Sequence, residues 1–381
     1  MSQPISFYVG HQGRGHANRA MAIIQALPAE RVVTILTARP ALFDRFARPV
    51  TIVQLPEEGD TATRPPPALA AQPTPDILHR APLGDPAIRR GMRTILDHLD
   101  GVDPALFVVD VAAEIALLAR IASVPAIGIR MHGNRGDAAH LAGYQACVGL
   151  LAPFDKALEQ ADTPDWIVAR TCYTGGLCTT QDPVPDKATA RAKLGLDPDR
   201  EIVVVLTGGG GAGTPYAPLT MAARALPETQ WLVLGPVQRE GHETDFGNLE
   251  LRGWVPDITD HLAAADIVLA SSGDTIVHEI ARVGRPYVCA PEWRYFDEQH
   301  RKADALAAAG VATVRPHLPS SAHGWTAALA DTLRDHRPDR QRAMIDDTPA
   351  DRAALWLEAL ADRLWTPLAA TPSLSLEPRI L

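Results

Sequence analysis

The sequence DIVLASSGDTIVHEIARVGRPYVCAPEWRYFDEQ, residues 266–299, decides the fold of this chain. It opens on a short run of apolar residues and turns sharply at Ser271, Ser272 and Gly273. Apolar residues then recur at helical spacing as far as Gly284, and a second short apolar run, PYVCAP, follows. A strand, a tight turn, a helix and another strand in this order are typical of a parallel sheet with crossover helices. The segment therefore predicts an α/β domain.

The same alternation continues outward from this segment. Short apolar runs separated by helical patterns fill the stretch from Ile5 to Arg130, and they resume at the fully apolar run IVVVLT. Between them lies DPVPDKATARAKLGLDPDRE, whose prolines and charges mark a domain boundary. We predict two doubly wound, Rossmann-like α/β domains that face a cleft, residues 1–185 and residues 186–345.

Two segments depart from this alternation. An amphipathic stretch within residues 346–365 predicts a C-terminal helix that packs back on the first domain, and residues 366–381 are expected to form a tail. The proline-rich stretch from Pro56 to Pro86 is longer than an ordinary connection in a compact domain. It is either a disordered surface insertion or a substrate-facing lid, and the sequence leaves both open.

Composition limits the classes of protein to which the chain can belong. Its 381 residues are 46% hydrophobic and 21% charged, which predicts a globular protein rather than a disordered one. A formal net charge of -9 argues against a general affinity for nucleic acid or for an anionic membrane. The sequence has no basic and apolar leader and no apolar stretch of bilayer length, so we expect a cytoplasmic protein without stable membrane insertion. The oligomeric state stays open.

Metal ligation is not indicated by the sequence. The four cysteines show no close-paired spacing of the kind that builds zinc or redox sites, and we expect reduced thiols. His132 and His140 do not form a recognised metal pair. We therefore predict no metal site.

The first connection between a strand and a helix is GHQGRGHANRA, residues 10–20. Its glycine spacing is not the dinucleotide fingerprint, and the next strand ends without an acid, so a nicotinamide-type cofactor is disfavoured. His16 stands where this loop enters the helix, and Asp110 ends the strand ALFVVD at the same edge of the sheet. His16 is therefore a candidate general base whose tautomer Asp110 fixes. Alternatively, both residues merely cap or pack helices, and the sequence does not decide between these interpretations.

Two loops of the second domain offer backbone amides to an anion. The loop TGGGGAGT follows the strand IVVVL and carries no bulky side chain, although it lacks the ending of the ATPase phosphate loop. In residues 266–299, the helix that begins at Asp274 or Thr275 has free amides that face the turn. Glu279 lies about one turn further along, where a carboxylate can reach a ribose diol. An ordinary strand, turn and helix with a solvated face is the alternative interpretation.

The run from Ser271 to Gln299 resembles the donor-site signature of GT-B glycosyltransferases, in particular the branch that includes the peptidoglycan N-acetylglucosaminyl transferase and the plant and antibiotic glycosyltransferases. The resemblance covers both domains, but only the second carries specific motifs. It implies that the helix after the turn receives the donor diphosphate, that Glu279 binds ribose, and that an acid–glutamine pair binds the transferred sugar. It also implies that the glycine loop contributes to the donor site and that backbone groups at the end of LELRGW bind the donor base. The expected donor-binding residues are therefore Gly208, Gly209, Gly210, Trp254, Val255, Ser271, Ser272, Gly273, Asp274, Thr275, Glu279, Glu298 and Gln299.

The resemblance also implies a reaction, because His16 and Asp110 match the order and separation of the family's catalytic dyad. We expect an inverting transfer from a nucleotide-diphosphate sugar, with uridine as the expected base, to a hydroxyl or amine of a small molecule or natural product. No cofactor and no metal are required, because helix and loop amides stabilise the leaving diphosphate. The expected acceptor-binding residues are Gly13, Arg14, Arg130 and His132.

Two other functions fit the same architecture. A nucleotide-sugar 2-epimerase has a similar donor site, although the long stretch from Pro56 to Pro86 favours a transferase. A non-catalytic protein that binds a nucleotide sugar is the third hypothesis, and it predicts binding without turnover.

The chain departs from the family's pattern in two places. Many members carry His or Arg at the position of Ser271, where it touches the diphosphate, and this chain adds an acid, Asp274, beside the expected phosphate site. An inward carboxylate there opposes an anionic ligand. Either Asp274 points outward as a helix cap, or the donor is bound in a different way.

Overall fold

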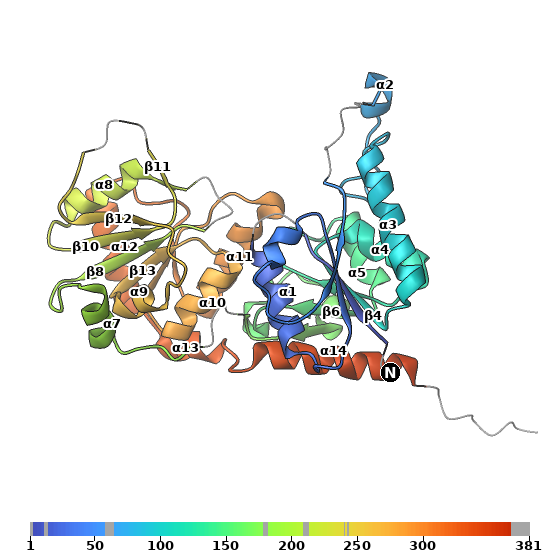
Figure 1. The fold of residues 1–381 in the computed structure, drawn as a ribbon. Helices are drawn as coiled ribbons and strands as arrows, with labels where there is room; N and C mark the ends of the chain where they lie inside the picture. The colour runs from blue at the N-terminus through green and yellow to red at the C-terminus, as the bar shows by residue number, and fades with distance from the viewer. Residues whose placement is uncertain are drawn as a thin grey trace, which may run out of the picture.

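The chain forms two α/β domains that lie side by side (Figure 1). The computed structural model describes residues 3–10, 14–57, 65–177, 182–208, 213–239, 241 and 244–366. Each domain is built on one parallel sheet, of seven strands in the first and six in the second. The predicted fold class, two doubly wound Rossmann-like domains, is confirmed.

The first domain has the strand order β3-β2-β1-β4-β5-β6-β7. The chain winds from β1 outward to β3 and then returns to the other side of β1 at β4, so the topological switch point lies between β1 and β4, where such sheets bind ligands. The strands are β1 (Ile5–Tyr8), β2 (Val33–Thr37), β3 (Thr51–Gln54), β4 (Leu106–Asp110), β5 (Ala126–Ile129), β6 (Gly149–Ala152) and β7 (Thr171–Tyr173). The helices are α1 (Arg14–Ala26), η1 (Pro40–Phe43), α2 (Pro67–Ala70), α3 (Pro86–Val102), α4 (Ala113–Ile121), α5 (Ala138–Ala146), η2 (Lys156–Leu158) and α6 (Asp165–Ala169).

The second domain repeats this plan with the strand order β12-β10-β8-β13-β14-β15. Its switch point lies between β8 and β13, which brings Thr207 and Gly208, directly after β8, to the same edge as the Ser271–Gly273 turn. The strands are β8 (Ile202–Leu206), β10 (Gln230–Leu234), β12 (Leu249–Gly253), β13 (Ile267–Ala270), β14 (Tyr287–Cys289) and β15 (Thr313–Val314), with a small separate pair of β9 (Thr214–Pro215) and β11 (Val237–Gln238). The helices are α7 (Lys187–Leu194), α8 (Tyr216–Ala225), α9 (Thr259–Ala264), α10 (Asp274–Val283), η3 (Tyr295–Asp297), α11 (Glu298–Ala309), α12 (Ala322–Asp335) and α13 (Pro338–Ala343).

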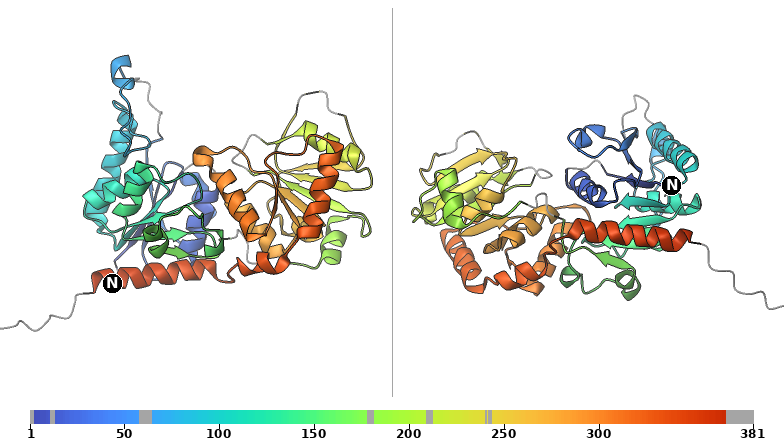
Figure 2. Two further views of the ribbon diagram at one scale, coloured as in Figure 1. Left: turned by 180° about the vertical axis from the view of Figure 1, so that it is seen from behind. Right: turned by 60° about the horizontal axis from the view of Figure 1, so that its bottom comes forward.

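The last helix, α14 (Pro349–Trp365), runs back beneath the first domain (Figure 2). It packs against α1 and buries Leu357 and Leu360 in the same core cluster as Ile23 and Ile24. Nε1 of Trp365 donates a hydrogen bond to the carbonyl of Ala105 at 3.0 Å. The chain therefore crosses between the domains twice.

One boundary prediction is wrong in an informative way. The sequence pattern predicts a helix from Val111, but α4 begins at Ala113, and Val111 has a φ of 64°. A β-branched residue in the left-handed region is a genuine outlier and carries about 1–3 kcal/mol of strain. The strained residue directly follows Asp110, the end of β4, and it turns the chain away at the ligand-binding edge of the sheet.

Of the stretch from Pro56 to Pro86, residues 56–57 and 65–86 are described. It contains α2 and then passes along the first domain, where Oε1 of Glu114 accepts hydrogen bonds from the amides of His79 and Arg80 at 2.5 and 3.0 Å. The His79 ring lies 5.0 Å from the ring of Phe296 in the second domain. This part of the stretch is thus attached to the protein and reaches the domain interface. Among the described helices, none is long and apolar enough to cross a bilayer.

Candidate active site at the domain interface

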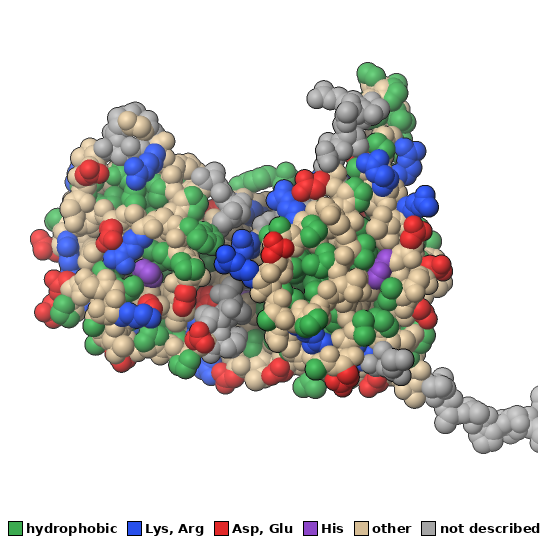
Figure 3. Space-filling view, viewed as in Figure 1, with side chains coloured by type: hydrophobic (Ala, Val, Ile, Leu, Met, Phe, Trp, Pro, Cys, Tyr) green, Lys and Arg blue, Asp and Glu red, His purple; other side chains and the backbone are tan. Residues whose placement is uncertain are grey.

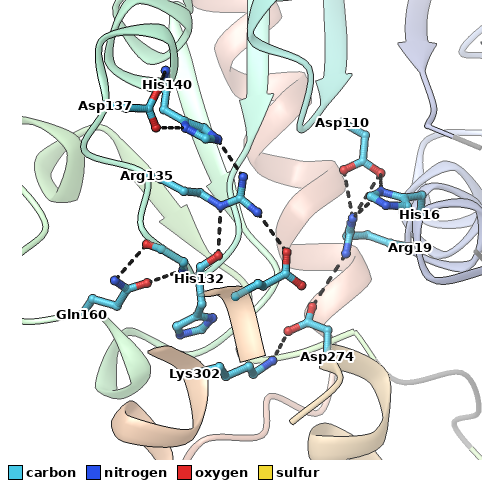
Figure 4. A network of polar contacts seen from close by, with 12 residues as sticks. His16, Arg19, Asp110, His132, Arg135, Asp137, His140, Gln160, Asp274 and Lys302 are labelled. Carbon is cyan, nitrogen blue, oxygen red and sulfur yellow. Dashed lines mark hydrogen bonds and ion pairs between the residues drawn. The ribbon is translucent and has the colours of Figure 1, made fainter. Parts of the chain in front are cut away.

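The switch point of the first domain brings His16 and Asp110 together. Nδ1 of His16 lies 2.9 Å from Oδ2 of Asp110, and Arg19 donates from one nitrogen to both carboxylate oxygens at 2.9 and 3.1 Å (Figure 4). The Arg19 nitrogen that bonds Asp110 also lies 3.2 Å from Nδ1 of His16, but the contact of Nδ1 with Asp110 is shorter. A carboxylate only accepts, so in that contact Nδ1 carries the hydrogen and Nε2 is left as the basic nitrogen. The Asp110 side chain is 3% exposed and that of His16 is 26% exposed, so the histidine is the member that a substrate can reach.

Arg19 belongs to this group as well, although no sequence motif pointed to it. It stands one helical turn after His16 on α1, a spacing that places both side chains on one face. Burial acts to raise the pKa of Asp110, but Arg19 and then His16 outweigh it, and the pKa of the carboxyl group falls below its usual value. Asp110 is therefore held as a carboxylate, the form that orients and stabilises a protonated histidine.

Arg19 also connects the dyad to the second domain. Its other terminal nitrogen lies 3.7 Å from Oδ2 of Asp274, the first residue of α10, and Lys302 of α11 forms an ion pair with the same carboxylate. Arg19 and Lys302 are 6% and 2% exposed. Burial acts to raise the pKa of Asp274, yet Lys302, His278 and Arg19 together lower it. Two buried cations thus meet one carboxylate at the start of α10.

The structure decides between the two placements that the sequence left for Asp274. The carboxylate does not cap α10, which begins after Gly273 without a side-chain cap, and it points inward to Lys302 and Arg19. The cation that the resemblance places at residue 271 is absent from this chain. Lys302 and Arg19 supply positive charge at the same helix start, from two other helices. Nothing in a linear motif relates Arg19 to residue 274, which explains why the sequence did not reveal this.

The remaining donor-site candidates lie around α10. Ser271 and Ser272 are buried, and the Ser272 hydroxyl donates to the carbonyl of Gln299 at 2.6 Å. Oε1 of Gln299 accepts from the amide of Glu292 at 2.7 Å, so this side chain shapes its own loop. Glu279 is fully buried, and its Oε2 lies 3.0 Å from Arg282.

Other candidates lie further out or outside the described part. Gly208 and Thr275 are half-buried, Val255 packs at the margin of the second core, and Trp254 is 66% exposed after β12. Gly13, Gly209 and Gly210 lie outside the described residues.

Two predicted acceptor contacts need correction. Arg130 is 5% exposed and forms a bidentate pair with Glu159, at 2.6 and 2.9 Å. His132 is 1% exposed, and its Nε2 lies 2.7 Å from the carbonyl of Leu158, which accepts the hydrogen bond. Burial lowers the pKa of His132 to about 3 and keeps it neutral. Both side chains are committed inside the first domain, so neither is kept as an acceptor contact, whereas Arg14 is exposed at the start of α1.

Glu298 takes part in a contact between the domains. Arg135, from the loop before α5, donates to its Oε2 at 2.9 Å. The backbone amide of Asn134 donates to the carbonyl of Phe296 at 2.6 Å, in the loop that precedes Glu298. The residue assigned to the transferred sugar is therefore held by the acceptor domain.

One group of described residues has the composition of a metal site. His79, Asp137 and His140 bring ligand atoms within 4.8 Å of one another. Oδ1 of Asp137 already accepts from the amides of Ala139 and His140 at 3.1 and 3.0 Å, as the N-cap of α5, and Arg135 lies 2.8 Å from Nε2 of His140. A cationic guanidinium beside the group disfavours a metal cation. Helix capping and hydrogen bonding explain this cluster.

The two domains enclose a hollow on the face seen in Figure 3, and Lys and Arg side chains line part of it. The dyad, α10 and the Arg135–Glu298 contact all lie at this interface. An oriented histidine on one side and a helix start with buried cations on the other side suit proton abstraction next to an anionic leaving group.

No protein-family model matches the chain. It is 28% identical to the UDP-N-acetylglucosamine–N-acetylmuramyl-(pentapeptide) pyrophosphoryl-undecaprenol N-acetylglucosamine transferase of Halorhodospira halophila over 267 residues, 66% of this chain and 71% of that protein. It is also 28% identical to the protein of the same name from Saccharopolyspora erythraea, over 79% of this chain and 78% of that one. Other relatives of this name match over 35% or 42% of their own length.

Solved structures resemble the chain over nearly its whole length. The glycotransferase of kitacinnamycin superposes with a TM-score of 0.66 at 16% identity, over 95% of this chain and 100% of that one. MurG of Acinetobacter baumannii gives a TM-score of 0.58 at 15% identity, over 95% of this chain and 99% of that one. At these identities the structures establish the fold alone.

The paired sheets and the sequence relatives together define the class, and the protein is a glycosyltransferase with the GT-B fold. This confirms the resemblance carried by residues 271–299. Within the class, the sequence relatives named above are N-acetylglucosamine transferases.

Proposed function

We propose that the protein is an inverting glycosyltransferase that moves a sugar from a UDP-sugar to a hydroxyl group of a small-molecule acceptor. The observation that carries the proposal is the oriented pair of His16 and Asp110, linked through Arg19 to the start of α10. In this arrangement the base in one domain faces the leaving-group site in the other. The sequence relatives are named for transfer from UDP-N-acetylglucosamine, which supports the uridine donor.

His16 carries the chemistry in this proposal. Its Nε2 takes the proton from the acceptor hydroxyl, and the oxygen attacks the anomeric carbon of the donor. The bond from that carbon to the diphosphate oxygen breaks in the same step, so the configuration inverts and UDP leaves. Asp110, held as a carboxylate, stabilises the resulting imidazolium.

The leaving diphosphate lies at the start of α10 in this proposal. The free amides of the first helical turn and the positive end of the helix dipole stabilise its charge. Lys302 and Arg19 add two cations at the same place. These groups supply the charge stabilisation that the reaction requires from this chain. The proposal assigns the ribose to Glu279, whose buried carboxylate is paired with Arg282 before the donor binds, and the transferred sugar to Glu298.

Two alternative functions differ in the fate of the bound donor. A nucleotide-sugar 2-epimerase changes the donor without any acceptor, and a binding protein changes nothing. The acceptor is a separate question. The sequence relatives are named for transfer to pyrophosphoryl-undecaprenol, a lipid-linked acceptor. Incubating UDP-sugars alone, with small-molecule acceptors and with a polyprenyl-diphosphate acceptor distinguishes these outcomes by the product formed.

The test of the dyad compares His16→Ala with His323→Ala, which alters an exposed histidine on α12. Loss of a general base typically lowers the rate by about 10²- to 10⁴-fold. We expect that loss for His16→Ala with UDP affinity nearly intact in calorimetry, and no loss for His323→Ala. Turnover by His16→Ala at the unaltered rate would remove His16 from the reaction.

A further inference from the structure

Arg135 takes no part in the catalytic dyad of His16 and Asp110. It stands in the loop between β5 and α5 of the acceptor domain, and its side chain is 7% exposed. Its three nitrogens each have a separate partner: Nε donates to the carbonyl of His132 at 2.9 Å, NH1 to His140 at 2.8 Å and NH2 to Glu298 at 2.9 Å. Glu298 is 34% exposed, so one side of its carboxylate is open to solvent or to a ligand.

The histidine behind Arg135 fixes the direction of this contact. Nδ1 of His140 lies 2.5 Å from Oδ2 of Asp137, and a carboxylate only accepts, so Nδ1 carries the hydrogen. Nε2 of His140 must then be the acceptor for Arg135, which has only donors. Burial lowers the pKa of His140 to about 4, in keeping with a neutral ring. Arg135 therefore donates to Glu298 on one side and to His140 on the other, and His140 in turn donates to Asp137. Figure 4 shows the part of this network from Arg135 to Asp137.

The backbones of the two loops fit together around this network. A Cβ atom on Gly133 would lie 2.9 Å from the carbonyl oxygen of Phe296, and Gly133 has a φ of 132°, so only glycine is accommodated. The Phe296 ring lies 5.3 Å from the guanidinium carbon of Arg135 and 4.6 Å from the His140 ring. Phe296 and Asp297 both have positive φ, 57° and 55°, in the left-handed region. The loop that ends at Glu298 thus holds a strained shape against the acceptor domain.

On the basis of the proposed function, we propose that Arg135 is a positioning residue for donor-sugar recognition. It holds the Glu298 carboxylate from the acceptor domain, so that the free oxygen of the carboxylate accepts hydrogen bonds from hydroxyls of the transferred sugar. His140 and Asp137 orient Arg135 and act only through it. The transferred sugar is therefore selected by both domains, through Glu298 of the second domain and Arg135 of the first.

This arrangement predicts that the affinity for the nucleotide and the affinity gained from the transferred sugar depend on different residues. UDP lacks the transferred sugar that Glu298 contacts, so its affinity does not depend on Arg135. A UDP-sugar gains affinity from Glu298 only when the carboxylate is held in place. The ratio of the affinity for UDP-N-acetylglucosamine to that for UDP is therefore the quantity to measure, by calorimetry on the full chain.

A second ion pair between the domains supplies the matched control. Arg301 of α11 pairs with Asp162 of the first domain, and in the described part of the chain neither residue forms a hydrogen bond or an ion pair with the Glu298 side chain. Arg301→Gln removes an arginine from the interface, as Arg135→Gln does, but leaves the sugar residue held. A general weakening of domain closure would act in both variants, whereas the loss of positioning would act only in Arg135→Gln.

We expect Arg135→Gln to lower the affinity ratio about tenfold, the typical worth of a charge-assisted hydrogen bond, with UDP affinity unchanged. Arg301→Gln should leave the ratio unchanged. Glu298→Gln alters a partly exposed side chain, and it should lower the ratio as far as Arg135→Gln does. The double variant should lose no more than either single one, because the two residues act as a unit.

An unchanged ratio in Arg135→Gln, or an equal fall in Arg301→Gln, would overturn the positioning role. Additive losses in the double variant would overturn it as well. If Arg135→Gln does not fold, His140→Gln removes the acceptor that orients Arg135 and should lower the ratio in the same direction. Failure of the unaltered protein to bind UDP would overturn the proposed donor and this inference with it, whereas UDP binding with an insensitive ratio overturns the inference alone.

Discussion

Asp274 provides a sharp test of the donor site, because an acid stands where an anion is proposed to bind. The variant Asp274→Asn keeps the shape of the side chain and removes its charge. Arg19 lies 3.7 Å from this carboxylate, and at an effective dielectric constant of about 20 two unit charges at that distance interact by about 4.5 kcal/mol. A diphosphate charge at roughly twice that separation from Asp274 is repelled by about 2 kcal/mol. That repulsion corresponds to roughly thirtyfold in affinity.

We therefore expect Asp274→Asn to bind UDP roughly ten- to thirtyfold more tightly, since Lys302 and Arg19 become available to the diphosphate. Uridine carries no phosphate, and its affinity should not change. The free variant should lose about 3–5 kcal/mol of stability, because the buried Lys302 loses its ion-pair partner, whereas Arg19 keeps Asp110. UDP should then raise its melting temperature more than it raises that of the unaltered protein.

Calorimetry with UDP and with uridine gives the ratio of the two affinities, which tests whether the Asp274 carboxylate competes with the diphosphate. Asp331→Asn is the matched control. Asp331 lies on α12 and also pairs with two cations, Arg315 at 2.6 Å and Arg334 at 2.7 Å. Its ratio of UDP to uridine affinity should equal that of the unaltered protein. The reasoning is refuted if Asp274→Asn leaves this ratio unchanged or lowers it, because the carboxylate would then not compete with the diphosphate.

Two further predictions concern buried groups. Glu279→Gln should weaken UDP binding about tenfold and leave pyrophosphate binding unchanged, because only UDP carries ribose. Calorimetry with both ligands measures this difference. An equal loss of affinity for both ligands would remove Glu279 from the ribose site. Burial lowers the pKa of His140 and of His278 to about 4, so their contribution to stability is present above pH 6.5 and is lost as the pH falls toward 4. Urea unfolding at several pH values should show this decline, and His278→Gln, which cannot take the proton, should be less steep; equal slopes would contradict the assignment.

Much of the fold could be predicted from local patterns. Apolar runs of strand length and the turn at Ser271 to Gly273 predicted a doubly wound sheet in each half, because a buried parallel strand needs a continuous apolar sequence and a crossover helix. The short strands β6 and β7 were not predicted from the sequence. Val111 interrupted the predicted start of α4 because its strained backbone depends on its surroundings rather than on its own preference.

The candidate site was likewise predicted only in part from the sequence. Position in a motif singled out His16, Asp110 and Glu279, because the carboxyl ends of parallel strands gather at one edge. The sequence did not relate these residues to Arg19 or Lys302, which reach Asp274 from helices that are far apart in the chain. It also offered Arg130 as an acceptor contact, although the structure pairs this side chain with Glu159 in the interior.

The run from residue 266 to residue 299 by itself predicted the type of fold, since the order of strand, turn and helix is a property of neighbouring residues, and its resemblance to a known signature suggested a nucleotide-sugar donor. Tertiary structure alone decided the charge balance at the start of α10 and the hold of Arg135 on Glu298. Coulomb energies and hydrogen bonds depend on distances in space. Those distances exist only once the two domains have packed against each other.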